Sequence, residues 1–134
     1  MNKITVLDVT LRDGGCVNNF NFGQVYMEKI LKAQEESGVE MIEMGYIDGK
    51  NGSESGRTQY VNEQVIPQTI LKNKKKGVTY VAMMDFGKFN PQNLAPRSEK
   101  SIDGLRVAFH KKDMHSMIDV CKTVMSKGYQ VYIQ

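Results

Sequence analysis

Residues 4–15 read ITVLDVTLRDGG, an apolar and β-branched run that ends in two opposite charges and two glycines. Such a run predicts a strand over Ile4–Leu11, with Asp8, Thr10 and Arg12 on one of its faces. The strand delivers a guanidinium and the neighbouring carboxylate together at its carboxyl end. Sheets and barrels of the α/β class place their active sites at that end of their strands.

The rest of the chain repeats one kind of joint, in which a helical segment ends in glycine and runs directly into a strand. The joint occurs as SGVEMIEMG from Ser37, KGVTYVAMM from Lys76 and KGYQVYIQ from Lys127. A glycine cap followed by a short connection is typical of a repeating β/α protein.

Hydrophobic periodicity and turn residues set the bounds of the other expected elements. We expect further strands at Met41–Gly45, Thr79–Asp85 and Gly104–Phe109 and from Tyr129, a polar loop at Asp48–Arg57, and at most a turn or two of helix within Phe89–Ser101. We expect helices at Gly23–Ser37, with Val25, Ile30, Leu31 and Ala33 inward, and at Asp113–Lys127, with Asp113 as the N-cap. A helix is also expected at Tyr60–Lys75, and its start is uncertain because of Pro67.

Several of these strands alternate between an apolar and a polar face. In the strand at 104–109, Arg106, Ala108 and His110 lie opposite the apolar positions. A doubly wound sheet buries both faces under helices, so a polar second face fits the inside of a β/α barrel better. A complete (β/α)₈ barrel needs about 250 residues, and this chain has 134. We therefore expect a single domain over 1–134, the N-terminal half of a barrel with about five parallel strands.

Composition favours an ordinary globular protein and excludes several functional classes. The chain is 40% hydrophobic and 25% charged, with a net charge of +3. Its main basic cluster, Lys72 and residues 74–76, is expected to be the solvated last turn of a helix rather than a nucleic-acid site, because it lacks stacking aromatic residues. We expect no nucleic-acid partner.

Cysteine usage and hydropathy indicate the compartment. Cys16 and Cys121 lie far apart and form no CxxC pair, which favours reduced thiols in the cytoplasm. No apolar run is long enough to cross a membrane, and the chain enters its first strand without a signal peptide. We expect a cytoplasmic protein without a membrane partner.

Three charged residues near the first two strands are the main candidates for chemistry. Asp13, beside flexible glycines, suits Mg²⁺ or Mn²⁺, although it could instead pair with Arg12 or cap a turn. Arg12 could stabilise an enolate or carboxylate, or form a buried ion pair with Asp8 or Glu43. Glu43 has apolar neighbours and needs a partner, for which Arg12 is the natural candidate.

Further candidates follow later strands. His110 could act as acid, base or hydrogen-bond donor, although a lone histidine is more often structural. Asp85 and Lys88 could line the same catalytic end of the expected barrel and contact substrate. Cys16 could also contact substrate, with packing as its alternative role. The loop at Asp48–Arg57 could bind phosphate or carboxylate, but it lacks the terminal GK[ST] of a P-loop.

The motifs DVTLRDGG, MIEMG and LRVAFHKKD, taken together and in this order, resemble those of the DRE-type TIM-barrel metallolyases. That superfamily includes 4-hydroxy-2-oxovalerate aldolase, hydroxymethylglutaryl-CoA lyase and isopropylmalate synthase. The resemblance spans the whole chain, and TLRDGG is its most specific part.

The resemblance implies a role for four residues. Asp13 matches the aspartate that binds a divalent metal, with Mn²⁺ or Mg²⁺ expected here. Arg12 matches the arginine that stabilises the enolate of pyruvate or an acyl-CoA, and Glu43 matches the glutamate that holds this arginine. His110 matches a position near the substrate. The implied reaction breaks or forms a carbon–carbon bond next to a 2-oxo acid or acyl-CoA, through an enolate that the metal stabilises.

Two departures from the family pattern affect these expectations. The histidine that acts as base just after RDG in the hydroxy-oxovalerate aldolases is replaced by Cys16, and the chain contains no His-x-His for the remaining metal ligands. We therefore expect the 134 residues to be inactive alone. The competing hypotheses are a non-catalytic half-barrel for binding or oligomerisation, and a phosphate-binding α/β enzyme. Open sheet edges predict self-association.

Overall fold

The computed structural model describes residues 4–50 and 54–134. Its strands are β1 (Leu7–Asp8), β2 (Met41–Ile47), β3 (Gln59–Tyr60), β4 (Thr79–Asp85), β5 (Gly104–Ala108) and β6 (Gln130–Ile133). They form one parallel sheet in the order β1-β2-β4-β5-β6, and β3 pairs with the end of β2. The expected fold, an α/β arrangement of about five parallel strands with intervening helices, is confirmed.

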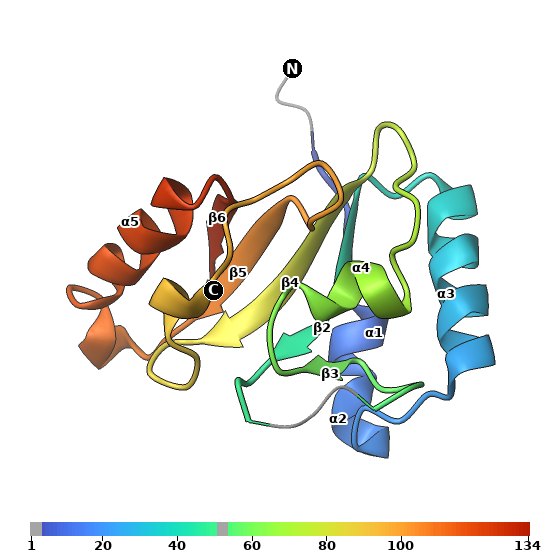
Figure 1. Ribbon diagram of the computed structural model, residues 1–134, viewed down its shortest axis with the longest axis horizontal. Coiled ribbons are helices and arrows are strands. Elements are labelled where there is room, and N and C mark those ends of the chain that lie inside the picture. Colours follow the sequence, from blue (N-terminus) through green and yellow to red (C-terminus); the bar gives the residue numbers. More distant parts are fainter. Residues whose placement is uncertain (1–3, 51–53) are drawn as a thin grey trace.

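The helices surround this sheet. They are α1 (Thr10–Asp13), α2 (Gly15–Asn18), α3 (Gln24–Ser37), α4 (Val65–Thr69), α5 (Met117–Ser126) and the short 3₁₀ helices η1 (Pro91–Asn93) and η2 (Lys111–Asp113). Figure 1 shows α3 and α5 at opposite ends of the sheet, and α1, α2 and β3 near the arrowhead of β2. These last three elements therefore lie at the carboxyl ends, the usual place of an α/β active site.

Each strand sends alternate side chains to two faces. In β4, Tyr80, Ala82 and Met84 join the main apolar core, whereas Met83 and Asp85 point the other way. The core is completed by residues such as Ile42, Met44, Leu105 and Val107 from neighbouring strands, with Met27 and Leu31 from α3 and Val124 from α5. The second face of the sheet is where the predicted polar positions lie.

The first strand is much shorter than predicted. Its hydrogen-bonded part ends at Asp8, whose Oδ1 accepts from the backbone N–H of Thr10 at 2.8 Å. The N–H groups of Arg12 and Asp13 then both donate to the carbonyl of Val9, at 3.0 and 2.7 Å. A local side-chain acceptor turns the chain into a helix at this point. Residues 10–13 consequently do not alternate as a strand.

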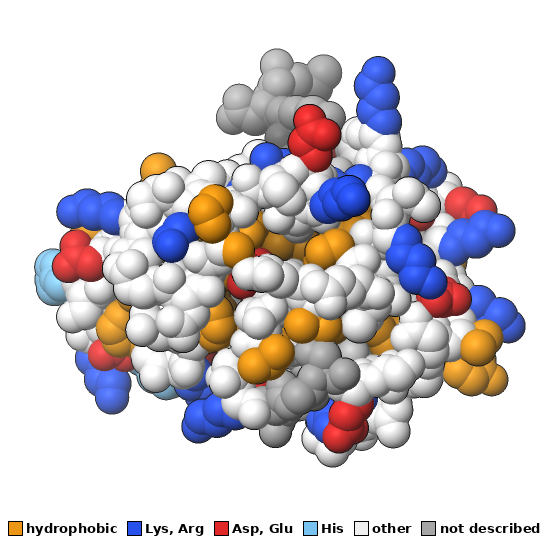
Figure 2. Space-filling model, viewed as in Figure 1, with side chains coloured by type: hydrophobic (Ala, Val, Ile, Leu, Met, Phe, Trp, Pro, Cys, Tyr) orange, Lys and Arg blue, Asp and Glu red, His pale blue; other side chains and the backbone are white. Residues whose placement is uncertain are grey.

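The predicted helix at Tyr60–Lys75 is wrong. Tyr60 belongs to β3, where its fully buried ring brings the hydroxyl to the carbonyl of Met44 at 3.1 Å. Only α4 is helical in this stretch, so the lysines that follow are not the last turn of a helix. They make separate contacts: Lys72 with Glu28 and Lys74 with Asp103. On the face in Figure 2, basic and acidic side chains are interspersed.

The remaining differences concern ends and faces. The helix expected from Asp113 is α5, whose N-cap is Ser116, and residues 111–113 form η2 instead. In α3, Val25 and Ala33 are exposed, contrary to expectation. Its inward face instead includes Gln34, because the amide donates to Asp8 Oδ1 at 2.6 Å. The strand at Thr79–Asp85 is confirmed over its full length.

Candidate active site

Glu43 of β2 binds two arginines from different parts of the chain. Its Oε2 accepts from Arg12 Nε at 2.9 Å, and its Oε1 accepts from Arg106 Nη1 at 2.7 Å. The Glu43 side chain is 0% exposed and each arginine side chain 14%. A carboxylate buried this deeply requires such partners, since an isolated buried charge is strongly unfavourable. The predicted Arg12–Glu43 pair is confirmed as a contact, and Arg106 adds a second cation.

Arg12 reaches Glu43 although it stands on α1 rather than on a strand. Its Nη1 also donates to Asp13 Oδ1 at 2.9 Å, which leaves Nη2 without a partner among the described residues. Burial acts to lower the pKa of Arg12, but the hydrogen bond and charge of Glu43 outweigh it and raise that pKa. The guanidinium is therefore charged, fixed on one edge and open on the other.

Arg12 lines a cavity of about 280 Å³ at the carboxyl ends of β2 and β4. Its walls are Arg12, Cys16, Phe20, Tyr46, Met83, Asp85 and Lys88. Four of these residues, namely Arg12, Cys16, Asp85 and Lys88, were candidates from the sequence. The structure thus brings the RDGGC segment and the end of the strand at 79–85 together around this cavity.

Tyr46 enters this site through an irregularity in β2. The pairing of β2 with β4 shifts in register between Glu43 and Tyr46. The side chains of these two residues therefore face the same side of the sheet, although they are three positions apart and a regular strand would turn them to opposite sides. Gly45 takes up the bulge with a φ of 143°, and a Cβ there would stand 2.1 Å from the carbonyl of Thr58. Alternation in the sequence gives no signal for Tyr46 because the bulge breaks the period.

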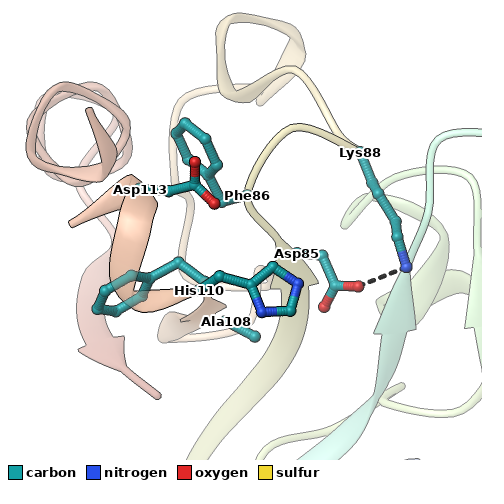
Figure 3. A pocket seen from close by; sticks show the side chains of 7 residues that line it. Asp85, Phe86, Lys88, Ala108, His110 and Asp113 are labelled. Carbon is teal, nitrogen blue, oxygen red and sulfur yellow. Dashed lines mark ion pairs between the residues drawn. The ribbon is translucent and has the colours of Figure 1, made fainter. Parts of the chain in front are cut away.

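His110 lies in a second cavity, of about 210 Å³, which adjoins the first because Asp85 and Lys88 line both. Figure 3 shows its imidazole turned toward the Asp85 carboxylate, with Asp113 on the other wall and the Lys88 ion pair drawn as a dashed line. His110 itself is exposed and follows β5. It is therefore at the same end of the sheet as Arg12, but outside the Arg12 cavity.

Asp13, the predicted metal ligand, is 67% exposed and faces Arg12. Within residues 4–50 and 54–134, no group of three or more His, Cys, Asp or Glu side chains is placed to hold a metal ion. Mg²⁺ is commonly held by one or two carboxylates together with several waters. Among the described residues, Asp13 therefore offers a single carboxylate rather than a cluster of ligands.

Two other sequence hypotheses concern the surface. The loop at Asp48–Arg57 lies partly outside the described residues, and in its described part Asp48 accepts from Gln59 Nε2 at 2.8 Å while Arg57 pairs with Glu54 at 3.3 Å. Both charges are engaged by neighbouring side chains.

Among the described residues, no helix has the length and apolar character needed to span a membrane.

Sequence reasoning missed Arg106 and Tyr46 as site residues. Arg106 had a signal, because it stands on the polar face of its strand and could have been matched to Glu43. The contact depends on the pairing of β5 with β4 and of β4 with β2, which local sequence does not report.

No protein-family model matches the sequence. Among solved structures, the chain is similar to the N-terminal domain of a putative aldolase from Bacteroides vulgatus, with a TM-score of 0.71 and 20% sequence identity. The similarity covers 97% of this chain and 44% of that one, so this chain spans less than half the length of the structure it matches. At this identity the likeness concerns the fold, and the chain shares the α/β parallel-sheet fold of that aldolase domain.

Proposed function

We propose that the chain is the N-terminal portion of an aldolase or lyase that makes or breaks a carbon–carbon bond next to a 2-oxo acid or an acyl-CoA. The observation that carries the proposal is Arg12. Its guanidinium is held by the buried Glu43, and the residue lines a cavity at the carboxyl end of the sheet. A preorganised cation of this kind stabilises the negative charge that develops on an enolate.

Two further points support an aldolase rather than another α/β enzyme. The solved structure of similar fold belongs to a protein described as a putative aldolase, and the TLRDGG motif resembles the metallolyase signature. On this proposal Glu43 orients Arg12, while Cys16 and Asp85 line the substrate space. His110 approaches the substrate from the adjoining cavity.

The proposed enzyme depends on a divalent cation, with Mn²⁺ or Mg²⁺ preferred and Asp13 as one ligand. Such an ion, when bound, acts as a Lewis acid toward the keto acid. A complete site requires ligands beyond those of the described residues. We therefore propose that this chain supplies Arg12 and its supports, and that turnover requires further barrel strands.

A binding experiment tests the proposal on the chain itself. Oxalate resembles the planar enolate of pyruvate, and we expect it to shift amide resonances of residues 12–20 and 83–88 in a ¹H–¹⁵N titration. Arg12→Lys keeps the charge but loses the forked geometry, and we expect it to weaken oxalate binding about tenfold. Arg97→Lys, remote from the cavity, is the matched control. Equal binding by Arg12→Lys and the unmodified chain would rule out this role.

A non-catalytic role is the alternative, and one observation favours it. An apolar cavity of about 520 Å³ lies between α5 and β6, lined by residues that include the exposed Met114, Ile118, Met125 and Ile133. Exposed apolar surfaces of this kind commonly mark interaction sites. The absence of any oxalate binding, together with stable self-association through this surface, would favour a binding or oligomerisation module.

A further inference from the structure

Tyr46, Asp85 and Lys88 form a connected unit at the carboxyl ends of β2 and β4. The Tyr46 hydroxyl donates to Asp85 Oδ2 at 3.0 Å, and Lys88 Nζ lies 2.6 Å from the same oxygen. The Lys88 ammonium also stands 5.8 Å from the centre of the Tyr46 ring. Figure 3 shows the ion pair between Lys88 and Asp85 beside the adjoining His110 cavity.

The unit faces the substrate space proposed above. Tyr46, Asp85 and Lys88 line the same cavity as Arg12 and Cys16. The Tyr46 ring is fixed by stacking on Phe20, with ring centres 5.9 Å apart and planes 18° apart. A phenol held by stacking and by a carboxylate is a preorganised proton donor and acceptor.

A carbon–carbon cleavage of the proposed kind needs a group that takes the proton of the substrate hydroxyl, and Tyr46 lines the cavity together with Cys16 and Arg12. Asp85 is the hydrogen-bond acceptor placed to receive the proton of the Tyr46 hydroxyl. Both Tyr46 and Lys88 contact its Oδ2, and among the residues described Oδ1 accepts no hydrogen bond. Burial and the Asp85 carboxylate raise the pKa of Tyr46, so its hydroxyl holds a proton at neutral pH. The hydrogen bond to Asp85 Oδ2 gives Tyr46 a group to which it can pass its proton as it accepts another.

We propose that Tyr46 and Asp85, with Lys88 as their charge partner, are the acid–base relay of the carbon–carbon bond reaction. The inference rests on the proposed function and adds the group that moves the proton. Tyr46 is the residue that touches the substrate, and Asp85 and Lys88 act through it. Arg12 and the relay then have different roles in one cavity. Arg12 stabilises the developing negative charge, and Tyr46 exchanges the proton.

The proton balance closes within this unit. In cleavage, the hydroxyl of the substrate gives its proton to the Tyr46 oxygen, and Tyr46 passes its own proton to Asp85. The electrons of the O–H bond form the new carbonyl of the departing aldehyde, and those of the broken carbon–carbon bond form the enolate beside Arg12. The same path returns one proton from Asp85 through Tyr46 to the enolate carbon. No oxidant, reductant or other reactant is consumed.

Two measurements on the intact chain test the relay. The first follows the ¹³Cζ resonance of Tyr46 with pH. Removing a nearby anion favours tyrosinate and removing a cation disfavours it. We therefore expect Asp85→Asn to lower the pKa of Tyr46 by about half a unit or more, and Lys88→Met to raise it by a similar amount. The ring of Tyr26, which is outside the cavity, serves as a reference in each sample.

The second measurement is an oxalate titration at neutral pH, read at the same Tyr46 resonance. Tyr46 contacts the ligand on this proposal, so we expect its resonance to shift with the same midpoint as the amides near Arg12. Tyr46→Phe identifies the resonance, and Tyr26→Phe is the matched control.

The outcomes separate the relay from the proposed function. Oxalate binding that shifts the Arg12 region but leaves Tyr46 unmoved would overturn the relay and leave the enzyme proposal standing. The relay would also be overturned if the pKa of Tyr46 is the same in Asp85→Asn, in Lys88→Met and in the unmodified chain. If oxalate does not bind at all, the proposed function fails first, and the relay fails with it.

Discussion

Glu43 is the residue on which the geometry of the site depends. It holds Arg12 through Oε2 and Arg106 through Oε1, and it has no exposed surface of its own. Removing its charge leaves two guanidinium groups close together with no shared anion. Loss of one partner from a buried ion pair is strongly destabilising, whereas exposed pairs contribute little.

We expect Glu43→Gln to lower the free energy of unfolding by about 3 kcal/mol or more, because two partly buried cations lose their common partner. Urea denaturation measures the change. Glu28→Gln is the control, since Glu28 and Lys72 are both well exposed and 3.9 Å apart, and its effect should stay below about 1 kcal/mol. Similar losses for the two variants would mean that the buried arginines are satisfied by other groups.

At the scale of one element, β2 depends on its bulge at Gly45. The positive φ of this residue and the nearby carbonyl of Thr58 leave no space for a side chain. The bulge is also what turns Tyr46 to the same face as Glu43. A single glycine therefore links the backbone geometry of the strand to the composition of the cavity.

We expect Gly45→Ala to destabilise the protein by about 2 kcal/mol or more, since it adds a backbone clash to the cost of a positive φ. Gly77→Ala is a matched control: Gly77 has a φ of 87°, but a Cβ added there would meet no atom within 4 Å. Its cost should be about 1 kcal/mol. Thermal unfolding followed by circular dichroism compares the two, and equal costs would show that the Thr58 carbonyl moves aside freely.

At the scale of the whole molecule, β1 and β6 are the terminal strands of the sheet. The side near β6 also carries the apolar surface formed with α5. Unpaired strand edges and exposed apolar surface both favour association with a second copy. The two terminal strands differ in this respect, because β1 is only two residues long.

We therefore expect the chain to self-associate through the α5 and β6 surface. Sedimentation velocity should give a mass above 15.2 kDa that rises with concentration. Met125→Lys should shift the chain toward the monomer, because it places a charge on that surface. Val25→Lys is the control, since Val25 is equally exposed at 61% but lies on α3. A monomer at every concentration would contradict the expectation.

The sequence by itself determined the order and type of most elements. The strand at Thr79–Asp85 follows from its apolar run after a glycine joint, and the strand at Gly104–Phe109 from alternation, which packing against one core imposes. It also indicated that Glu43 needs Arg12, since a charge among apolar neighbours requires a partner. Local rules failed where a side chain competed for the backbone, as Asp8 does when it ends β1 early.

Only the tertiary structure decided which residues meet around the cavity. Arg106 reaches Glu43 because β4 stands between their strands in register, and Tyr46 reaches Asp85 because a bulge shifts β2 by one residue. Tyr60 lies in a strand rather than at the start of a helix because its backbone pairs with the end of β2, at Ile47. These contacts join residues that are distant in sequence, and their free energy arises only when the whole sheet is formed.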